Sequence, residues 1–247
     1  NYTEKGFNQY APMGGVVSLK EKIGRKIVSA GGRQYHPENE IIITAGATQG
    51  IYSAISAVVN PQDEVIVFDP SYDSYVPSII LNGGIPIRLE LQKNDYRINW
   101  EKVRSNVNSR TKAIIINTPQ NPTGTVWSEE DMQMLKSIVS GTNIVIISDE
   151  VYEHMVFDGK KHLSITGDRE LSERAFVVYS FGKTFHITGW RAGYIVAPKH
   201  LMAEFIKCHQ FQAYAVNTPV QHAISDYIEN ETKYLELNDF FEQKRDF

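Results

Sequence analysis

The chain has one cysteine, and it has no long apolar run. Because Cys208 is alone among the 247 residues, no internal disulfide framework can form. No stretch approaches the roughly 20 apolar residues that a membrane-spanning helix needs, and no signal-peptide pattern stands at the beginning. The sequence therefore predicts a globular protein of the reducing cytoplasm that has no membrane partner.

The sequence also lacks an excess of charge of one sign. Its 25 basic and 29 acidic residues are interspersed and give a net charge of -4, without the basic blocks that bind nucleic acid. None of the seven histidines stands at metal-ligand spacing from other ligands. We therefore expect neither a nucleic-acid partner nor a metal site.

Seven short apolar runs rich in β-branched residues are present instead. Their hydrophobicity is nearly continuous, which is typical of strands covered on both faces in a mainly parallel sheet. The connection between the last two runs is too short for a parallel crossover, so the last strand should be antiparallel. The sequence predicts an α/β fold with strands at residues 40–44, 64–69, 85–91, 112–117, 143–149, 175–181 and 193–198.

Helical patterns lie between these runs. The clearest spans residues 128–140, where Ser128 is the expected N-cap and three acidic residues fill the first turn. Further helices are predicted at residues 15–30, 48–60 and 200–213. Helices in these connections would cover both faces of the sheet.

Polar residues follow several of the strands, at the edge where α/β sheets bind ligands. Small residues around Gly46 open a helix whose free N–H groups could hold a phosphate. Tyr72 follows the second strand and could stack on a planar ligand, and Asn121 lies in a proline-rich loop after the fourth. Taken singly, each of these features is more often structural.

Charged residues follow the fifth and sixth strands. Asp149 ends an apolar strand, and a buried carboxylate needs a cation or several donors. Lys183 has apolar and aromatic neighbours, so it is either a surface lysine or a nucleophile of lowered basicity that forms a Schiff base. Arg191 suits a bidentate grip on phosphate, although a lone arginine more often forms a surface salt bridge. A glycosidase-like pair of Asp149 and Glu150 is disfavoured, because neighbours in a strand point to opposite faces.

Together these segments resemble the class I/II aminotransferases, which are fold-type I enzymes that use pyridoxal 5'-phosphate (PLP). The residues that carry the resemblance are 121–124 (NPTG), 148–152 (SDEVY), 180–185 (SFGKTF) and 188–194 (TGWRAGY). The similarity extends over essentially the whole chain and is greatest to the branch of methionine, kynurenine and glutamine aminotransferases. It implies a large domain with a mainly parallel seven-stranded sheet and one antiparallel strand.

The resemblance also implies a role for each residue around the PLP ring. Lys183 would form the Schiff base and then act as general base and acid. Asp149 would pair with the protonated ring nitrogen, and Tyr72 would stack on the ring. Tyr152 and Asn121 would donate hydrogen bonds to the phenolic oxygen.

A second implied group would hold the phosphate of PLP. It consists of the main chain and side chains at Ala47 and Thr48, with Ser180 and Arg191. Tyr10 would reach the phosphate in a neighbouring subunit, so a homodimer with shared active sites is expected. Because Ala47 stands where many relatives have a hydroxyl residue, only its backbone N–H could serve, and one ligand is missing from the usual set.

The expected organisation has three parts. Residues 1–35 lead into a PLP-binding large domain at residues 36–230, and residues 231–247 begin a helix that links to a C-terminal small domain. The family binds the substrate carboxylate through an arginine of that small domain, which this sequence does not contain. Because the chain begins without Met and ends within a polar, helix-like stretch, we expect it to be part of a longer polypeptide.

The function that the resemblance implies is a transaminase. Its substrates would be a 2-oxo acid and an L-amino acid that is methionine, aromatic or glutamine-like. One alternative is a PLP-dependent carbon–sulfur β-lyase, which would release pyruvate and ammonia. Another is the aminotransferase-like domain of a PLP-binding transcription regulator, which would carry a basic helix-turn-helix upstream.

Overall fold

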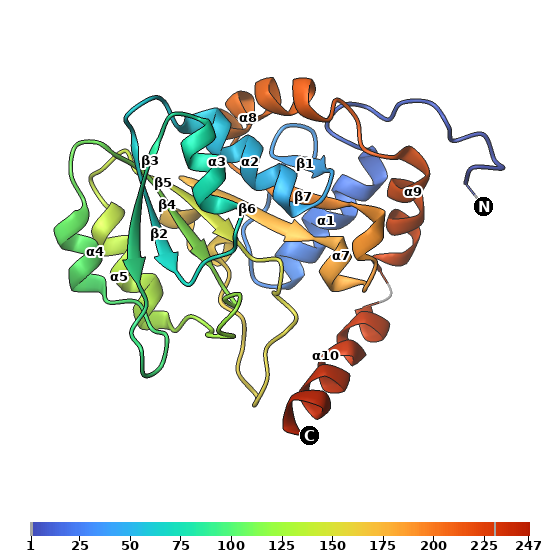
Figure 1. Ribbon diagram of the computed structural model, residues 1–247. Helices are drawn as coiled ribbons and strands as arrows, with labels where there is room; N and C mark the ends of the chain where they lie inside the picture. The colour runs from blue at the N-terminus through green and yellow to red at the C-terminus, as the bar shows by residue number, and fades with distance from the viewer. Residues whose placement is uncertain (1, 230) are drawn as a thin grey trace.

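A mixed seven-stranded sheet forms the centre of the molecule (Figure 1). The computed structural model describes residues 2–229 and 231–247, without the side chains of residues 231–235. The strands are β1 (Ile41–Thr44), β2 (Glu64–Asp69), β3 (Ile85–Glu90), β4 (Thr111–Asn117), β5 (Val145–Asp149), β6 (Ala175–Ser180) and β7 (Gly193–Val196). Each lies within two residues of a predicted run, so the prediction of seven strands is confirmed.

The strand order is β1-β7-β6-β5-β4-β2-β3. β7 is antiparallel to β1 and β6, whereas β6, β5, β4, β2 and β3 pair in parallel. The prediction of an antiparallel last strand is therefore confirmed. Gly193 at the start of β7 lies beside Thr44 and Ser180, the last residues of β1 and β6. The carboxyl ends of six strands consequently share one edge of the sheet.

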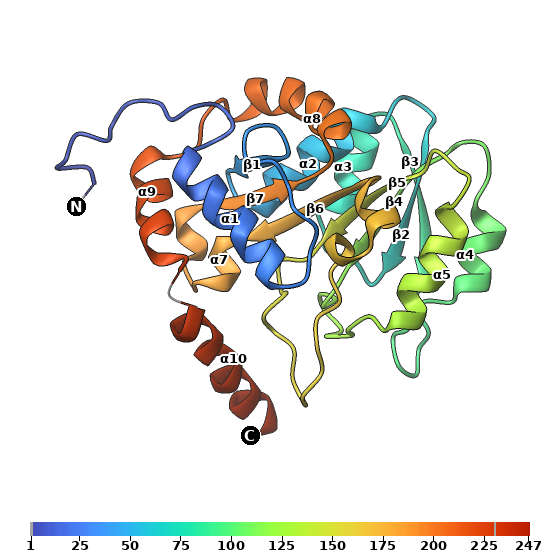
Figure 2. The same cartoon turned by 180° about the vertical axis from the view of Figure 1, so that it is seen from behind.

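Helices cover both faces of the sheet, as predicted. Figure 1 shows α2 (Ala47–Val58) and α3 (Tyr75–Leu81) in front, and α8 (Lys199–Gln212) packs on α2. Figure 2 shows the opposite face, which carries α1 (Val17–Ser29), α4 (Trp100–Asn106) and α5 (Glu129–Val139). The short α6 (Arg169–Ser172) and α9 (Thr218–Tyr227) lie on that second face.

Alternation along the strands explains this layering. Ile146 of β5 and Val177 of β6 belong to the apolar cluster under α1 and α5, whereas the next residues, Ile147 and Val178, belong to the cluster under α2 and α8. Since successive side chains point to opposite faces, a strand that is apolar throughout is covered on both sides. The continuous hydrophobicity read from the sequence has this origin.

The four predicted helices correspond to α1, α2, α5 and α8. The Ser128 hydroxyl accepts a hydrogen bond from the Asp131 N–H, and the Asp131 carboxylate accepts one from the Ser128 N–H. This reciprocal cap is the reason that α5 begins at the predicted position. Three of the helices that pattern reasoning missed, α3, α4 and α6, have seven residues or fewer, which is too short to display a helical period.

Helix α10 (Glu231–Asp246) extends away from the body beside the long loop that follows β5 (Figure 1). Asn238 donates a hydrogen bond to the Val156 carbonyl, and Arg245 donates to both carboxylate oxygens of Asp158. The helix spans Glu231–Asp246, while the division of the chain into three parts and the role of this helix as a link to a further domain stay predictions. The predicted boundary at residue 230, and residue 1, lie outside the described residues. No helix in the described ranges is long and apolar enough to cross a membrane.

Candidate active site

One pocket at the carboxyl edge of the sheet collects nearly all of the predicted site residues. Its lining includes Ala47, Thr48, Tyr72, Asn121, Asp149, Tyr152, Ser180, Lys183 and Arg191. Tyr10 is the exception: its side chain is 80% exposed and lies edge-on against Tyr214. Residues from five separate parts of the sequence are thus brought together as one site, because the strands that carry them end side by side.

The first helix after β1 provides one end of the pocket. Gly46 precedes α2 with a φ of 83° and no side chain caps this helix, so its first N–H groups face the pocket without a side-chain acceptor. The Arg191 guanidinium lies against this turn, since a Cβ atom on Gly46 would be 2.7 Å from Arg191 Nη2. Gly193 is packed as tightly, because its Cβ atom would be 2.6 Å from the Tyr179 carbonyl oxygen and 3.1 Å from Ala47 N. The turn is therefore a cradle of N–H groups beside a cation, which suits an anion.

Two hydroxyl groups complete this anion cradle. Thr48 Oγ1 lies 3.2 Å from the Tyr72 hydroxyl, and Ser180 ends β6 at the pocket wall. Arg191 donates a hydrogen bond to the Thr188 carbonyl and forms no ion pair with any carboxylate in the described part of the chain. The surface salt bridge considered for Arg191 is consequently not found, and its charge is available to a ligand.

A buried carboxylate forms the opposite end of the pocket. Asp149 is 4% exposed; its Oδ2 accepts a 2.5 Å hydrogen bond from the Tyr75 hydroxyl, and its Oδ1 accepts one of 3.3 Å from the Val151 N–H. Burial raises the pKa of Asp149 to about 6, although these donors and the charge of Lys183 favour the ionised form. At neutral pH the site therefore holds a mostly ionised carboxylate with room for a further donor.

Lys183 lines the pocket together with these two groups. Sequence reasoning placed it at the end of the sixth strand; β6 ends at Ser180, and Lys183 lies in the helical turn that follows, α7 (Phe181–Thr184). Its Nζ is 5.5 Å from the centre of the Tyr152 ring and has no carboxylate partner among the described residues. Burial raises the pKa of Tyr152, so this phenol stays protonated at neutral pH. The residue is thus half-buried, and its amine forms no ion pair or hydrogen bond within the described ranges, which suits a nucleophile.

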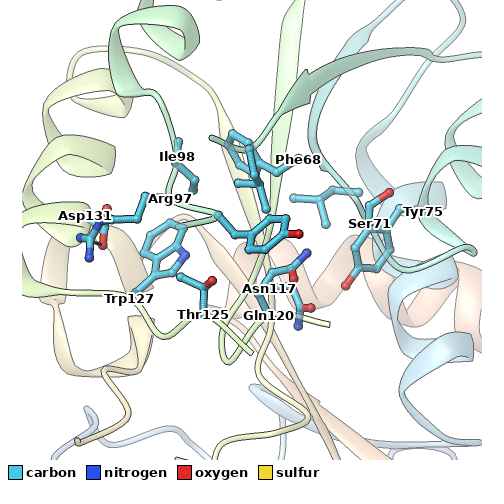
Figure 3. A pocket seen from close by; sticks show the side chains of 13 residues that line it. Phe68, Ser71, Tyr75, Arg97, Ile98, Asn117, Gln120, Thr125, Trp127 and Asp131 are labelled. Atoms are coloured by element: carbon cyan, nitrogen blue, oxygen red, sulfur yellow. Dashed lines mark hydrogen bonds and ion pairs between the residues drawn. The ribbon is translucent and has the colours of Figure 1, made fainter. Parts of the chain in front are cut away.

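Two further residues hold the site together and were missed by sequence reasoning. Asn117 donates a 2.8 Å hydrogen bond to the Asp149 carbonyl and accepts one of 2.7 Å from the Asn121 N–H. Tyr75 donates to the Asp149 carboxylate from α3. Figure 3 shows both side chains in the lining of a second pocket. An asparagine ending a strand that is otherwise buried and apolar was a usable signal for Asn117, whereas Tyr75 gave none.

Glu150 points away from the pocket, as strand alternation predicts. Its carboxylate accepts hydrogen bonds from the Ser148 hydroxyl, the Ile165 N–H and the Tyr179 hydroxyl, and it lies 2.9 Å from His162 Nε2. Glu150 and Asp149 therefore cannot flank one substrate bond as the acid and base of a glycosidase-like pair. Within the described ranges, no group of three or more His, Cys, Asp or Glu side chains could hold a metal ion.

Comparisons with known proteins identify the family of this chain. The family model described as aminotransferase class I and II matches residues 2–247. The methionine aminotransferase of Escherichia coli K12 is 47% identical over 247 residues, which cover 100% of this chain and 64% of that protein. A kynurenine–oxoglutarate transaminase of Dictyostelium discoideum is 34% identical over 98% of this chain and 60% of its own length.

Solved structures give the same result. The crystal structure of an E. coli protein with a methionine aminotransferase function has a TM-score of 0.96 and 46% identity, covering 99% of this chain and 65% of that one. The structure of N-succinyldiaminopimelate aminotransferase from Mycobacterium tuberculosis has a TM-score of 0.96 and 34% identity, and the match covers 99% of this chain and 64% of that one. The chain thus spans somewhat less than two thirds of the length of these relatives. On the match over residues 2–247, the chain belongs to the class I and II aminotransferase family.

Proposed function

We propose that this chain forms the cofactor site of a PLP-dependent aminotransferase that moves the amino group of an L-amino acid to a 2-oxo acid. The observation that carries the proposal is the arrangement of three groups in one pocket. Lys183 lines the same pocket as the anion cradle at the start of α2 and the buried carboxylate of Asp149. PLP has a phosphate, an aldehyde and a ring nitrogen, and the donor set fits each of them.

When bound, PLP would supply a conjugated ring that accepts the electron pair left when a Cα proton is removed. The chain's own residues would set the conditions for that chemistry. The Asp149 carboxylate would keep a proton on a ring nitrogen beside it, because an opposite charge raises the proton affinity of a base. Its burial excludes competing water, which makes this pairing stronger than at a surface.

Lys183 would act twice. Its Nζ would hold PLP covalently through the aldehyde group, with release of one water, until a substrate amine displaces it. The freed amine would then remove the Cα proton as general base and return a proton to the cofactor carbon as general acid. The position of Lys183 in a short turn supports this role, since no carboxylate among the described residues holds the amine away from the pocket.

Three residues would orient the ring, and four would hold the phosphate. Tyr72 would stack on the ring, and its hydroxyl contact with Thr48 would fix the plane of the phenol. Asn121, held at its N–H by Asn117, would donate a hydrogen bond to the phenolic oxygen, as would Tyr152. The phosphate would lie at the start of α2, with the Ala47 N–H, Thr48, Ser180 and Arg191 around it.

The finer features of the function are proposals as well. The relatives named for methionine and kynurenine support a methionine or aromatic amino acid as donor. We propose a cytoplasmic homodimer in which the exposed Tyr10 reaches the phosphate of the partner subunit's site. The relatives described above are all named for amino transfer, which favours this function over a β-lyase or a transcription regulator.

The test uses Lys183→Ala, with the exposed Lys161→Ala as the matched control. Wild-type protein and control should turn yellow with PLP, and borohydride should attach the cofactor to the peptide that contains Lys183. The Lys183 variant should show neither signal and no turnover. A colourless wild-type protein, or label on another lysine, would contradict the proposal. Pyruvate and ammonia release without any need for an oxo acid would point to the lyase instead.

A further inference from the structure

A buried tyrosine behind the pocket is joined to both ends of the candidate site. Tyr75 is the first residue of α3, is 3% exposed, and lines the neighbouring pocket of Figure 3 rather than the candidate site. It therefore has no direct access to a ligand in that site. We infer that Tyr75 is a positioning residue: its hydroxyl aims the Asp149 carboxylate into the pocket, and its ring sets the angle of the Tyr72 ring.

The hydroxyl of Tyr75 fixes one side of the carboxylate. It donates to Asp149 Oδ2 over 2.5 Å, which is at the short end for a bond between a hydroxyl and a carboxylate. The Val151 N–H donates to Asp149 Oδ1, and Asn117 Nδ2 donates to the main-chain carbonyl of Asp149. Asp149 is thus held at its backbone and at both oxygens, so its remaining lone pairs have a defined direction.

The ring of Tyr75 supports the expected stacking residue. Its centroid lies 5.7 Å from that of Tyr72 at an interplanar angle of 74°, which is a favourable edge-to-face contact. The Tyr72 hydroxyl lies in turn 3.2 Å from Thr48 Oγ1. A continuous set of contacts therefore runs from Thr48 at the anion cradle through the two tyrosines to Asp149. One residue outside the pocket controls the relative placement of both ends.

The charged and titratable groups around Asp149 make this hydroxyl important. Lys183 favours the ionised form of the carboxylate, whereas Glu150, on the far side of β5, opposes it. Tyr152 also faces Asp149 but forms no hydrogen bond with it in the described structure. Burial and Asp149 together raise the pKa of Tyr75 well above 10, so its phenol remains a donor across the neutral range. The Tyr75 hydroxyl and the Val151 N–H are thus the two hydrogen-bond donors that favour the ionised form of the Asp149 carboxylate.

The alternative is that Tyr75 merely fills the apolar cluster under α2 and α3, to which it belongs. Two substitutions separate these roles. Tyr75→Phe removes the hydroxyl and keeps the ring against Tyr72, whereas Tyr75→Leu removes both. Tyr96→Phe is the matched control, because Tyr96 lines the same neighbouring pocket, is 45% exposed and has no bond to Asp149.

The first measurement needs no cofactor. The side-chain carboxyl of Asp149 is titrated by ¹³C NMR in PLP-free protein, with its signal assigned from Asp149→Asn. Loss of a hydrogen bond to a charged group should raise the pKa of Asp149 by about one to two units in Tyr75→Phe and leave it unchanged in Tyr96→Phe. If Tyr75 only fills the apolar cluster, the pKa of Asp149 in Tyr75→Phe should equal that of the wild-type protein.

The second measurement rests on the proposed function and follows PLP binding by absorbance. If only the ionised carboxylate binds well, Tyr75→Phe should bind PLP about two- to tenfold more weakly at about pH 7 and almost normally at about pH 9. Tyr75→Leu should bind weakly at both pH values, because the Tyr72 ring loses its support. An unshifted Asp149 titration, or a loss of affinity in Tyr75→Phe that is equal at both pH values, overturns the inference. Failure of the proposed function is distinguishable, because wild-type protein would then form no adduct at Lys183 while the titration stayed measurable.

Discussion

The buried carboxylate of Asp149 should make the PLP-free protein less stable above the acidic range, and Asp149→Asn should remove this cost. In the fold the pKa of Asp149 rises from 3.8 to about 6, because burial disfavours the charged form. A shift of about two units corresponds to about 3 kcal/mol when the carboxyl group is fully ionised. The amide has a similar shape, can still accept from the Tyr75 hydroxyl, and has no charge to bury.

The direction of the pH dependence follows from proton binding. Between about pH 4 and about pH 6 the folded protein holds a proton on Asp149 that the unfolded chain has released, so stability falls as pH rises through this range. The variant lacks this titration. Its advantage in free energy of unfolding over the wild-type protein should therefore grow by about 2 kcal/mol between about pH 4.5 and about pH 8.

The assay is urea unfolding of both PLP-free proteins at several pH values, followed by circular dichroism. Only the difference between variant and wild type is used, because His162 also titrates in this range. Burial lowers the pKa of His162, but its hydrogen bond to Glu150 and the negative charges of Glu150 and Glu153 together outweigh this and leave the pKa raised. Asp73→Asn, at an exposed carboxylate, should give a difference that hardly varies with pH. A constant difference for Asp149→Asn, or one that shrinks toward high pH, would refute the reasoning.

Three further predictions concern the cradle, a buried ion pair and a helix cap. Gly46→Ala should weaken PLP binding in an absorbance titration and cost about 1–3 kcal/mol in urea unfolding, because the φ of 83° is strained for alanine and the new Cβ would displace the Arg191 guanidinium. Lys26→Met should destabilise the fold by about 3–5 kcal/mol, since Lys26 Nζ lies 2.7 Å from the Glu153 carboxylate and both side chains are about nine-tenths buried. Adding Glu153→Gln should recover part of that loss, and no recovery would contradict this explanation. Ser128→Ala should cost about 1 kcal/mol in the same assay through loss of the α5 cap, and Ser137→Ala on the same helix serves as its control.

Much of the fold could be predicted because its signals are local. A strand such as β6 is buried on both faces and is therefore apolar throughout, and the start of α5 is marked by a cap that lies within four residues. The residues of the pocket follow strand ends, so their meeting at one edge follows from parallel pairing. Lys183 was placed only approximately, because a single helical turn after a strand has no periodic signal.

The supporting contacts could not be predicted for the opposite reason. The bond from Tyr75 to Asp149 joins positions 74 residues apart, and the ion pair of Lys26 with Glu153 joins positions 127 apart. Each depends on how a helix packs against the sheet, which no local pattern specifies. Sequence reasoning therefore identified groups that would touch a ligand and missed the groups that hold them.

The two neighbouring carboxylates at the end of β5 show how structure separates a functional acid from a structural one. Both are buried, and alternation sends them to opposite faces. Glu150 is surrounded by four hydrogen-bonding partners, which is enough to satisfy an ionised carboxylate without any ligand. Asp149 has two, and its raised pKa shows that they do not offset its burial. At neutral pH, a buried acid left short of partners at the mouth of a pocket lowers the stability of the fold, and a protonated base such as a pyridine nitrogen bound beside it would offset that cost.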